Sequence, residues 1–136
     1  MAKPWCKNYQ GMHKKDECEA GVKFADLPLY GTTKFHDACP CFGPGSGSCS
    51  KAAYPTQEEM KATDLARDER FLKVVVARHA IVESLGGDWK RGMPATSGRI
   101  DCPVCQAKDA LRFSRAGCNG HIHAGCATEG CVRWSE

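Results

Sequence analysis

Ten cysteines in a chain of 136 residues are the side chains best suited to chemistry. Five of them lie before residue 50 and five after residue 101, so they form two separate groups. Clustered thiols in a reducing compartment usually bind metal instead of forming disulfides. Four thiolates hold zinc in a closed tetrahedron. The cysteine content therefore predicts zinc sites with a structural role.

The C-terminal group opens with a CxxC knuckle at Cys102 and Cys105, in which two thiolates can share one ion. Asn119-Gly120 favours a two-residue hairpin turn, which predicts pairing of residue 118 with 121, 116 with 123 and 113 with 126. Cys126 then returns to the hairpin base beside the knuckle. Cys118 lies at the tip, roughly 16 Å away along the strand, too far for a Zn–S bond of about 2.3 Å. The predicted ligands are Cys102, Cys105, Cys126 and Cys131.

The two faces of this hairpin differ in polarity. Alternation along the strands puts Leu111, Phe113 and Ile122 on the side of Cys126, where we expect a small core. The other face carries arginine and histidine, which can contact phosphate or an acidic partner. An ordinary solvated face is the simpler alternative. The residues expected to contact nucleic acid or another partner are Arg99, Arg112, Arg115, His121 and His123.

The N-terminal group has no standard finger spacing. If Cys39-Pro40-Cys41 is extended, its two thiols point in opposite directions, and only one of them would ligate. With one ion in each group, eight of the ten cysteines are ligands. Cys118 and one cysteine of this pair are then left over, and whether Cys39 or His13 takes a ligand position is open. The candidates are Cys6, His13, Cys18, His36, Cys39, Cys41 and Cys49.

Between the two groups the sequence predicts one long helix. Thr56 and Glu59 form a capping box after Pro55, and Gly86-Gly87 is a stop signal. We expect the second half of the helix to pack on one module through a wide apolar face. That face comprises Phe71, Val74, Val75, Ile81, Val82 and Leu85.

These elements predict a small metal-stabilised α+β fold. Its parts are a loop-rich N-terminal zinc module at residues 1–54, a connecting helix at 55–86, a linker at 87–99 and a C-terminal zinc-ribbon β-hairpin at 100–136. The apolar helix could also pair with a second copy, so a dimer through the helix is an alternative.

Charge and hydropathy restrict the functional class. The net charge of +3 is mild and leaves the partner undecided. The N-terminal MAKPWCKNYQ lacks an apolar signal-peptide core, and no segment approaches the roughly 20 apolar residues of a membrane span. We therefore expect a cytoplasmic protein. Closed four-thiolate sites and the lack of a recognisable catalytic motif predict that the protein is not an enzyme.

Several features in both cysteine groups are shared with a known group of proteins: Cys6, GMHKKDECEAGV, Pro40-Cys41, Cys49, Tyr54-Pro55-Thr56, CPVC, Leu111, NGHIHAGC, Cys131 and Trp134. Together they resemble the motifs of small zinc-ribbon proteins encoded by tailed bacteriophages and prophages. The resemblance implies Cys6, Cys18, Cys41 and Cys49 as the N-terminal ligands, two structural zinc ions in all, and the cytoplasm of a bacterial host. It implies no particular activity.

We therefore expect a non-enzymatic binding or adaptor protein that contacts nucleic acid. The alternative is an inhibitor that binds a host or defence protein, for example a CRISPR nuclease complex or the transcription machinery, through the apolar helix. A minor component of the virion is a third alternative.

Overall fold

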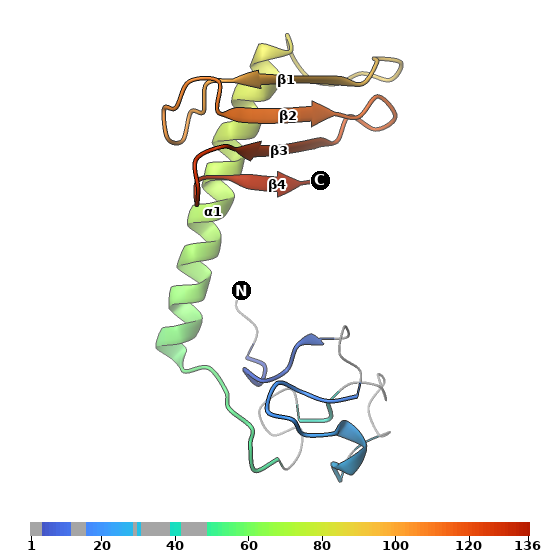
Figure 1. Ribbon diagram of the computed structural model, residues 1–136, viewed down its shortest axis with the longest axis vertical. Helices are drawn as coiled ribbons and strands as arrows, with labels where there is room; N and C mark the ends of the chain where they lie inside the picture. Colours follow the sequence, from blue (N-terminus) through green and yellow to red (C-terminus); the bar gives the residue numbers. More distant parts are fainter. Residues whose placement is uncertain (1–3, 12–15, 29, 31–38, 42–48) are drawn as a thin grey trace. The chain divides into compact units, whose positions relative to one another are not determined.

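The computed structural model describes residues 4–11, 16–28, 30, 39–41 and 49–136 of the chain. Within these residues it contains one long helix, a short 3-10 helix and a four-stranded antiparallel sheet (Figure 1). The chain divides into two compact units, Met1–Leu65 and Ala66–Glu136. The predicted small α+β class is confirmed. Of the helices in the described parts, none has both the length and the apolar character needed to cross a lipid bilayer.

Helix α1 spans Gln57–Ser84, close to the predicted range of 55–86. Its start is the predicted capping box: the Thr56 N–H donates to Glu59 Oε2 at 2.7 Å, and the Glu59 N–H donates to Thr56 Oγ1 at 3.2 Å. Its end is the predicted glycine pair, where Gly86 has a φ of +81° and the Gly87 N–H donates to Val82 O. Local capping chemistry therefore fixes both ends of the helix.

The sheet belongs to the C-terminal unit and has the strand order β1-β2-β3-β4. The strands are β1 (Thr96–Ile100), β2 (Leu111–Arg115), β3 (Ile122–Cys126) and β4 (Arg133–Ser135). The predicted hairpin is thus only the centre of the sheet. Residues 96–99, which we expected in the linker, belong to β1, and β4 was not predicted at all.

The predicted hairpin register is wrong by two residues. Cys126 pairs with Leu111, not Phe113, and Arg115 pairs with Ile122. The connection between the two strands is a six-residue loop, 116–121. Within it, the Ala116 N–H donates to the His121 carbonyl, and the Gly120 N–H donates to the Ala116 carbonyl. A shift of two residues keeps every side chain on its predicted face. Leu111, Phe113, Ile122 and Cys126 are indeed buried together.

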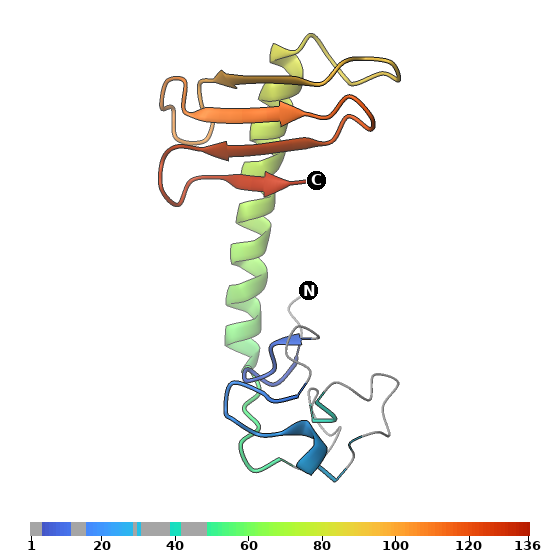
Figure 2. The same ribbon diagram turned by 45° about the vertical axis from the view of Figure 1, so that its right-hand side comes forward.

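Helix α1 crosses one face of the sheet and covers its core (Figures 1 and 2). Ala77 and Ile81 are fully buried there, with Val74, Val82 and Leu85 packed around them. Two residues of the predicted apolar face do not take part, since Phe71 is 66% exposed and Val75 is 44% exposed. Phe71 lies before the first packed residue, and Val75 is rotated by about 100° from Val74 around the helix.

The last residue of the chain connects α1 to the sheet. Arg78 Nε donates to Glu136 Oε1 at 2.6 Å, and the Ile122 N–H donates to Glu136 Oε2 at 2.9 Å. Burial alone would raise the pKa of Glu136, but these two hydrogen bonds outweigh it and lower the pKa.

The N-terminal unit has its own small core. Phe24, in the 3-10 helix η2 (Phe24–Asp26), is buried with Cys18, Cys39 and Cys41. The Tyr54 hydroxyl donates to the Cys41 carbonyl at 3.0 Å, which ties the segment before α1 to this core. His13 and His36, two of the predicted candidate ligands, lie outside the described residues.

Candidate metal centre

Four thiols meet at one end of the sheet in the C-terminal unit. The ligand atoms of Cys102, Cys105, Cys126 and Cys131 all lie within 4.8 Å of one another. Two of the sulfur–sulfur distances are 3.7 Å (Cys102–Cys131) and 3.6 Å (Cys105–Cys126). Four bonds of about 2.3 Å to a tetrahedral zinc ion require edges of about 3.8 Å, whereas a disulfide requires about 2.05 Å. The arrangement therefore suits a metal ion, and it is the set that the spacing predicts.

Different elements position these thiols. The knuckle turns back on itself because the Gln106 N–H donates to the Cys102 carbonyl at 2.8 Å, with Gln106 at a φ of +63°. Cys126 is the last residue of β3, and Cys131 follows Gly130, whose φ of +70° reverses the chain. The Thr128 N–H donates to Cys126 Sγ at 3.4 Å.

Three of the four thiols have a shifted pKa. The Thr128 hydroxyl, 3.3 Å from Cys105 Sγ, and the backbone of Ala107 lower the pKa of Cys105 to about 6. Burial instead raises the pKa of Cys102 and of Cys131. Cys105 therefore ionises before Cys102 and Cys131. A divalent ion would favour the thiolate form of every thiol that binds it.

Cys118 takes no part in this cluster. It is exposed, in the loop between β2 and β3, at the opposite end of the strands from Cys126. The geometric prediction that Cys118 is not a ligand of this cluster agrees with its position, although the predicted register was wrong.

Five further thiols surround a small cavity of about 10 Å³ in the N-terminal unit. Residues 40–41 form a turn and are not extended, so the condition under which the two thiols were expected to point apart is not met, and both Cys39 and Cys41 line the same cavity. Burial raises the pKa of Cys39 to about 11. Among the described residues, no three thiols of this group lie as close together as the C-terminal four. The cysteines lining the cavity are Cys6, Cys18, Cys39, Cys41 and Cys49.

The outer face of the sheet, away from α1, carries a row of arginines. Strand register aligns Arg99 with Arg112, Arg112 with Gly125, and Gly125 with Arg133. All three arginines are exposed, and no ion pair involves them in the part of the chain that the structure describes. We call Arg99, Arg112 and Arg133 the arginine row.

A second row on the same face is polar but lacks formal charge. Register places Ser97, Ser114, His123 and Ser135 side by side across the four strands. His123 Nδ1 is hydrogen-bonded to Ser135 Oγ. The outer face therefore presents guanidinium groups beside hydroxyl and imidazole groups, all of which can bond to phosphate oxygens.

Two other predicted contact residues have different positions. Arg115 is only 6% exposed: it points to the inner face, and its Nη1 donates to the Gly87 carbonyl at 3.3 Å. Its prediction as a partner contact is wrong, and strand alternation with Leu111 and Phe113 would have shown this. His121 is exposed but lies in the β2–β3 loop, where its N–H donates to Asn119 Oδ1.

Arg133 was missed because β4 was missed. Its signal in the sequence is the short alternation Val132-Arg133-Trp134-Ser135, in which Val132 is buried and Arg133 exposed. Three strand residues are too few to stand out against the preceding loop.

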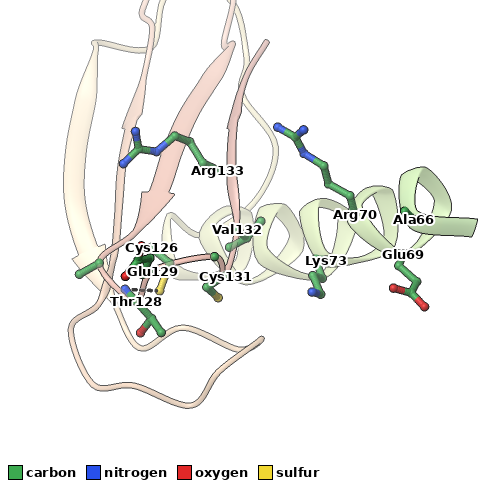
Figure 3. Close-up of a pocket in the computed structure, with 12 residues that line it drawn as sticks. Ala66, Glu69, Arg70, Lys73, Cys126, Thr128, Glu129, Cys131, Val132 and Arg133 are labelled. Atoms are coloured by element: carbon green, nitrogen blue, oxygen red, sulfur yellow. Dashed lines mark hydrogen bonds between the residues drawn. The ribbon is translucent and has the colours of Figure 1, made fainter. Parts of the chain in front are cut away.

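Two hollows flank β4. The outer one, of about 720 Å³, is lined by Arg112, His123 and Arg133 of the sheet and by Arg70 of α1. The inner one, of about 470 Å³, lies between α1 and the segment 126–133. Arg70 and Arg133 line both hollows, and Glu69 extends to the opposite side of the helix from Arg70 (Figure 3). Comparisons with models of protein families, with curated proteins and with solved structures find no match for this chain.

Proposed function

We propose that this protein is a zinc-stabilised binding module that contacts the phosphates of nucleic acid through the arginine row. Zinc supplies folding free energy in this proposal and does no chemistry, because four thiolates leave no open coordination position. The observation that carries the proposal is the alignment of Arg99, Arg112 and Arg133 in one exposed row.

A row of neighbouring arginines lowers the stability of the folded sheet unless an anion binds to it. Neighbouring strands lie about 4.7–4.9 Å apart, and like charges directly opposite one another destabilise a sheet. Arg99 and Arg112 are directly opposite, and no carboxylate pairs with either of them among the described residues. A polyanion that bridges the row would offset the repulsion and release its own counterions.

The composition of the outer face points to phosphates instead of bases. Its strand positions hold arginine, serine, histidine and glycine. The aromatic strand residues Phe113 and Trp134 alternate to the other face and reach this side only where they line part of the outer hollow. Sequence-tolerant base stacking needs aromatic platforms. We therefore expect binding with little dependence on base sequence.

Fluorescence anisotropy with labelled oligonucleotides of two unrelated sequences tests this proposal. Three phosphate contacts on a single strand predict a slope of log K against log salt of about −2 or steeper. Arg112→Gln and Arg133→Gln should each weaken binding and flatten this slope. Lys108→Gln, which removes an exposed cation outside both hollows, is the matched control and should do neither. Binding that is absent at low salt, or indifferent to salt, would refute the proposal.

A second candidate function follows from the exposed apolar side chains of α1. Phe71, Leu72, Val75 and Val76 are 44–66% exposed on the C-terminal part of the helix. Apolar residues at such helical spacing are typical of a helix that packs into a groove of another protein. In this reading the protein is an inhibitor or adaptor that binds a host protein.

The two functions can be separated with one pair of variants. Phe71→Gln combined with Leu72→Gln should abolish capture of a protein partner from host lysate and leave oligonucleotide affinity unchanged. Arg112→Gln should weaken oligonucleotide binding and leave capture of the protein partner unchanged. If captured protein survives the double substitution, the helix is not the docking surface.

A further inference from the structure

The outer hollow beside β4 gathers cations from three separate elements. Arg112 comes from β2, Arg133 from β4 and Arg70 from α1, and His123 of β3 lies among them. Among the described residues, no carboxylate lines this hollow. Arg70 therefore adds a cation to Arg112 and Arg133 of the arginine row, beyond the edge of the sheet.

Gly125 makes a gap in the arginine row. It lies between Arg112 and Arg133 in register and has no side chain of its own. A Cβ atom at this position would lie 3.4 Å from Arg133 Nε and 3.7 Å from Arg133 Cγ. The Arg133 side chain thus lies over Gly125, on the side of Arg112, and a larger side chain at position 125 would displace it.

We propose, building on the proposed function, that Gly125 lets the Arg133 side chain lie toward Arg112 so that these two arginines form a seat for one phosphate, and that Arg70 contacts the next phosphate of a single-stranded nucleic acid. Two neighbouring guanidinium groups can hold the oxygens of one phosphate. The strand then runs across the β-strands, from Arg112 past β4 toward α1.

The path of the cations favours a single strand over a duplex. They lie on β2 and β4 of the outer face and, past the edge of β4, on α1. A flexible strand can follow the cations around the edge of β4. A stiff duplex, with a persistence length of about 50 nm, would meet the flat row and not turn toward Arg70.

The salt dependence of binding tests the role of Arg70. With Arg70 as a fourth contact, the single-strand slope should be about −3, and Arg70→Gln should reduce it by about 0.7. Lys61→Gln, which removes another exposed cation of α1, is the control and should leave the slope unchanged. If the wild-type slope is near −2 and Arg70→Gln has no effect, the arginine row stands but the extension to α1 is refuted.

A substitution that changes no charge tests the phosphate seat. Gly125→Val should weaken single-strand binding about tenfold or more, the effect of losing one charge-assisted contact. Ser97→Val places the same β-branched side chain on the same face outside the hollow and should have little effect. Zinc content and circular dichroism of both variants show that they fold.

Two outcomes would refute this inference without contradicting the proposed function. One is full affinity in folded Gly125→Val while Arg112→Gln still weakens binding. The other is a duplex that binds as tightly as its single strand and with the same dependence on Arg70 and Gly125. A wild-type protein that binds neither form would instead refute the proposed function itself.

Discussion

Arg112 and Arg115 are three residues apart on β2 and have opposite environments. Arg112 is exposed on the outer face, whereas Arg115 is buried and donates to the Gly87 carbonyl. Strand alternation alone separates them. One arginine is thus available to a ligand, and the other holds the segment after α1 against the sheet.

Substituting Arg115 should therefore affect stability and not binding. Arg115→Met keeps the aliphatic volume but leaves the Gly87 carbonyl without its donor, at an expected cost of about 1–3 kcal/mol in the free energy of unfolding. Chemical denaturation measures this cost. The salt slope for oligonucleotides should match that of the wild type; a flatter slope would mean that Arg115 reaches the ligand after all.

Cys126 and Cys118 provide a second contrast at the scale of single residues. Cys126→Ser removes one of four clustered thiols and should release the metal and unfold the C-terminal unit, because structural zinc contributes on the order of 10 kcal/mol in small modules. Cys118→Ser changes an exposed side chain and should be silent. Zinc content and thermal melting report both effects, and the reverse pattern would disprove the ligand assignment.

Metal binding should release protons in a number set by the thiol acidities. Burial raises the pKa of Cys102 and of Cys131, so both remain protonated at pH 7 and must each lose a proton to zinc, whereas the pKa of Cys105 is lowered to about 6. Affinity should therefore rise with pH, and below pH 6 Cys105 adds a further proton. Calorimetry in two buffers of different ionisation enthalpy counts these protons in the Cys6→Ser variant, which weakens the other thiol group.

At the scale of elements, the β2–β3 loop shows how a turn depends on residues distant in sequence. Gly120 has a φ of +74°, and a Cβ atom there would lie 2.6 Å from Trp89 Cγ. Trp89 thus packs directly on the loop backbone, a contact with a residue distant in sequence that the Asn119-Gly120 turn signal does not contain.

Gly120→Ala should destabilise the C-terminal unit through two effects. The left-handed backbone costs about 1–2 kcal/mol with a side chain present, and the Trp89 ring must also move. Gly86→Ala, at a φ of +81° with nothing within 4 Å of the added Cβ, measures the backbone cost alone. Equal losses in the free energy of unfolding for the two variants would exclude the Trp89 contact.

Elements with local signals were predictable, and elements held by distant partners were not. Both ends of α1 follow from Thr56, Glu59 and the glycine pair, all within a few residues of the termini they fix. β1 and β4 form only because they pair with β2 and β3. Strands of five and three residues are too short for their polarity pattern to predict them from the sequence alone.

At the scale of the whole molecule, each compact unit has its own group of thiols. The C-terminal ligand set followed from spacing, because a knuckle and a hairpin leave few geometric choices. The N-terminal set did not, because five cysteines face one cavity and no repeat fixes their order. The arginine row was only partly foreseen: Arg99 and Arg112 were named, but Arg133 depended on an unpredicted strand.

Native mass spectrometry should find two zinc ions on each chain. Cys126→Ser should lose one ion and Cys41→Ser the other, because the two groups lie in separate units. Cys39→Ser separates the remaining alternatives: retention of both ions would agree with Cys41 as the ligand. A single ion on the wild-type chain would show that the N-terminal thiols serve another purpose.

The low pKa of Cys105 has a practical consequence for experiments in which a chelator removes the metal. A thiolate is a far better nucleophile than a thiol, and Cys105 is partly exposed. Iodoacetamide added together with a chelator should therefore alkylate Cys105 before Cys102 or Cys131. Once that sulfur carries a carbamidomethyl group, returning zinc cannot restore the site, and a reversible loss of metal becomes permanent damage.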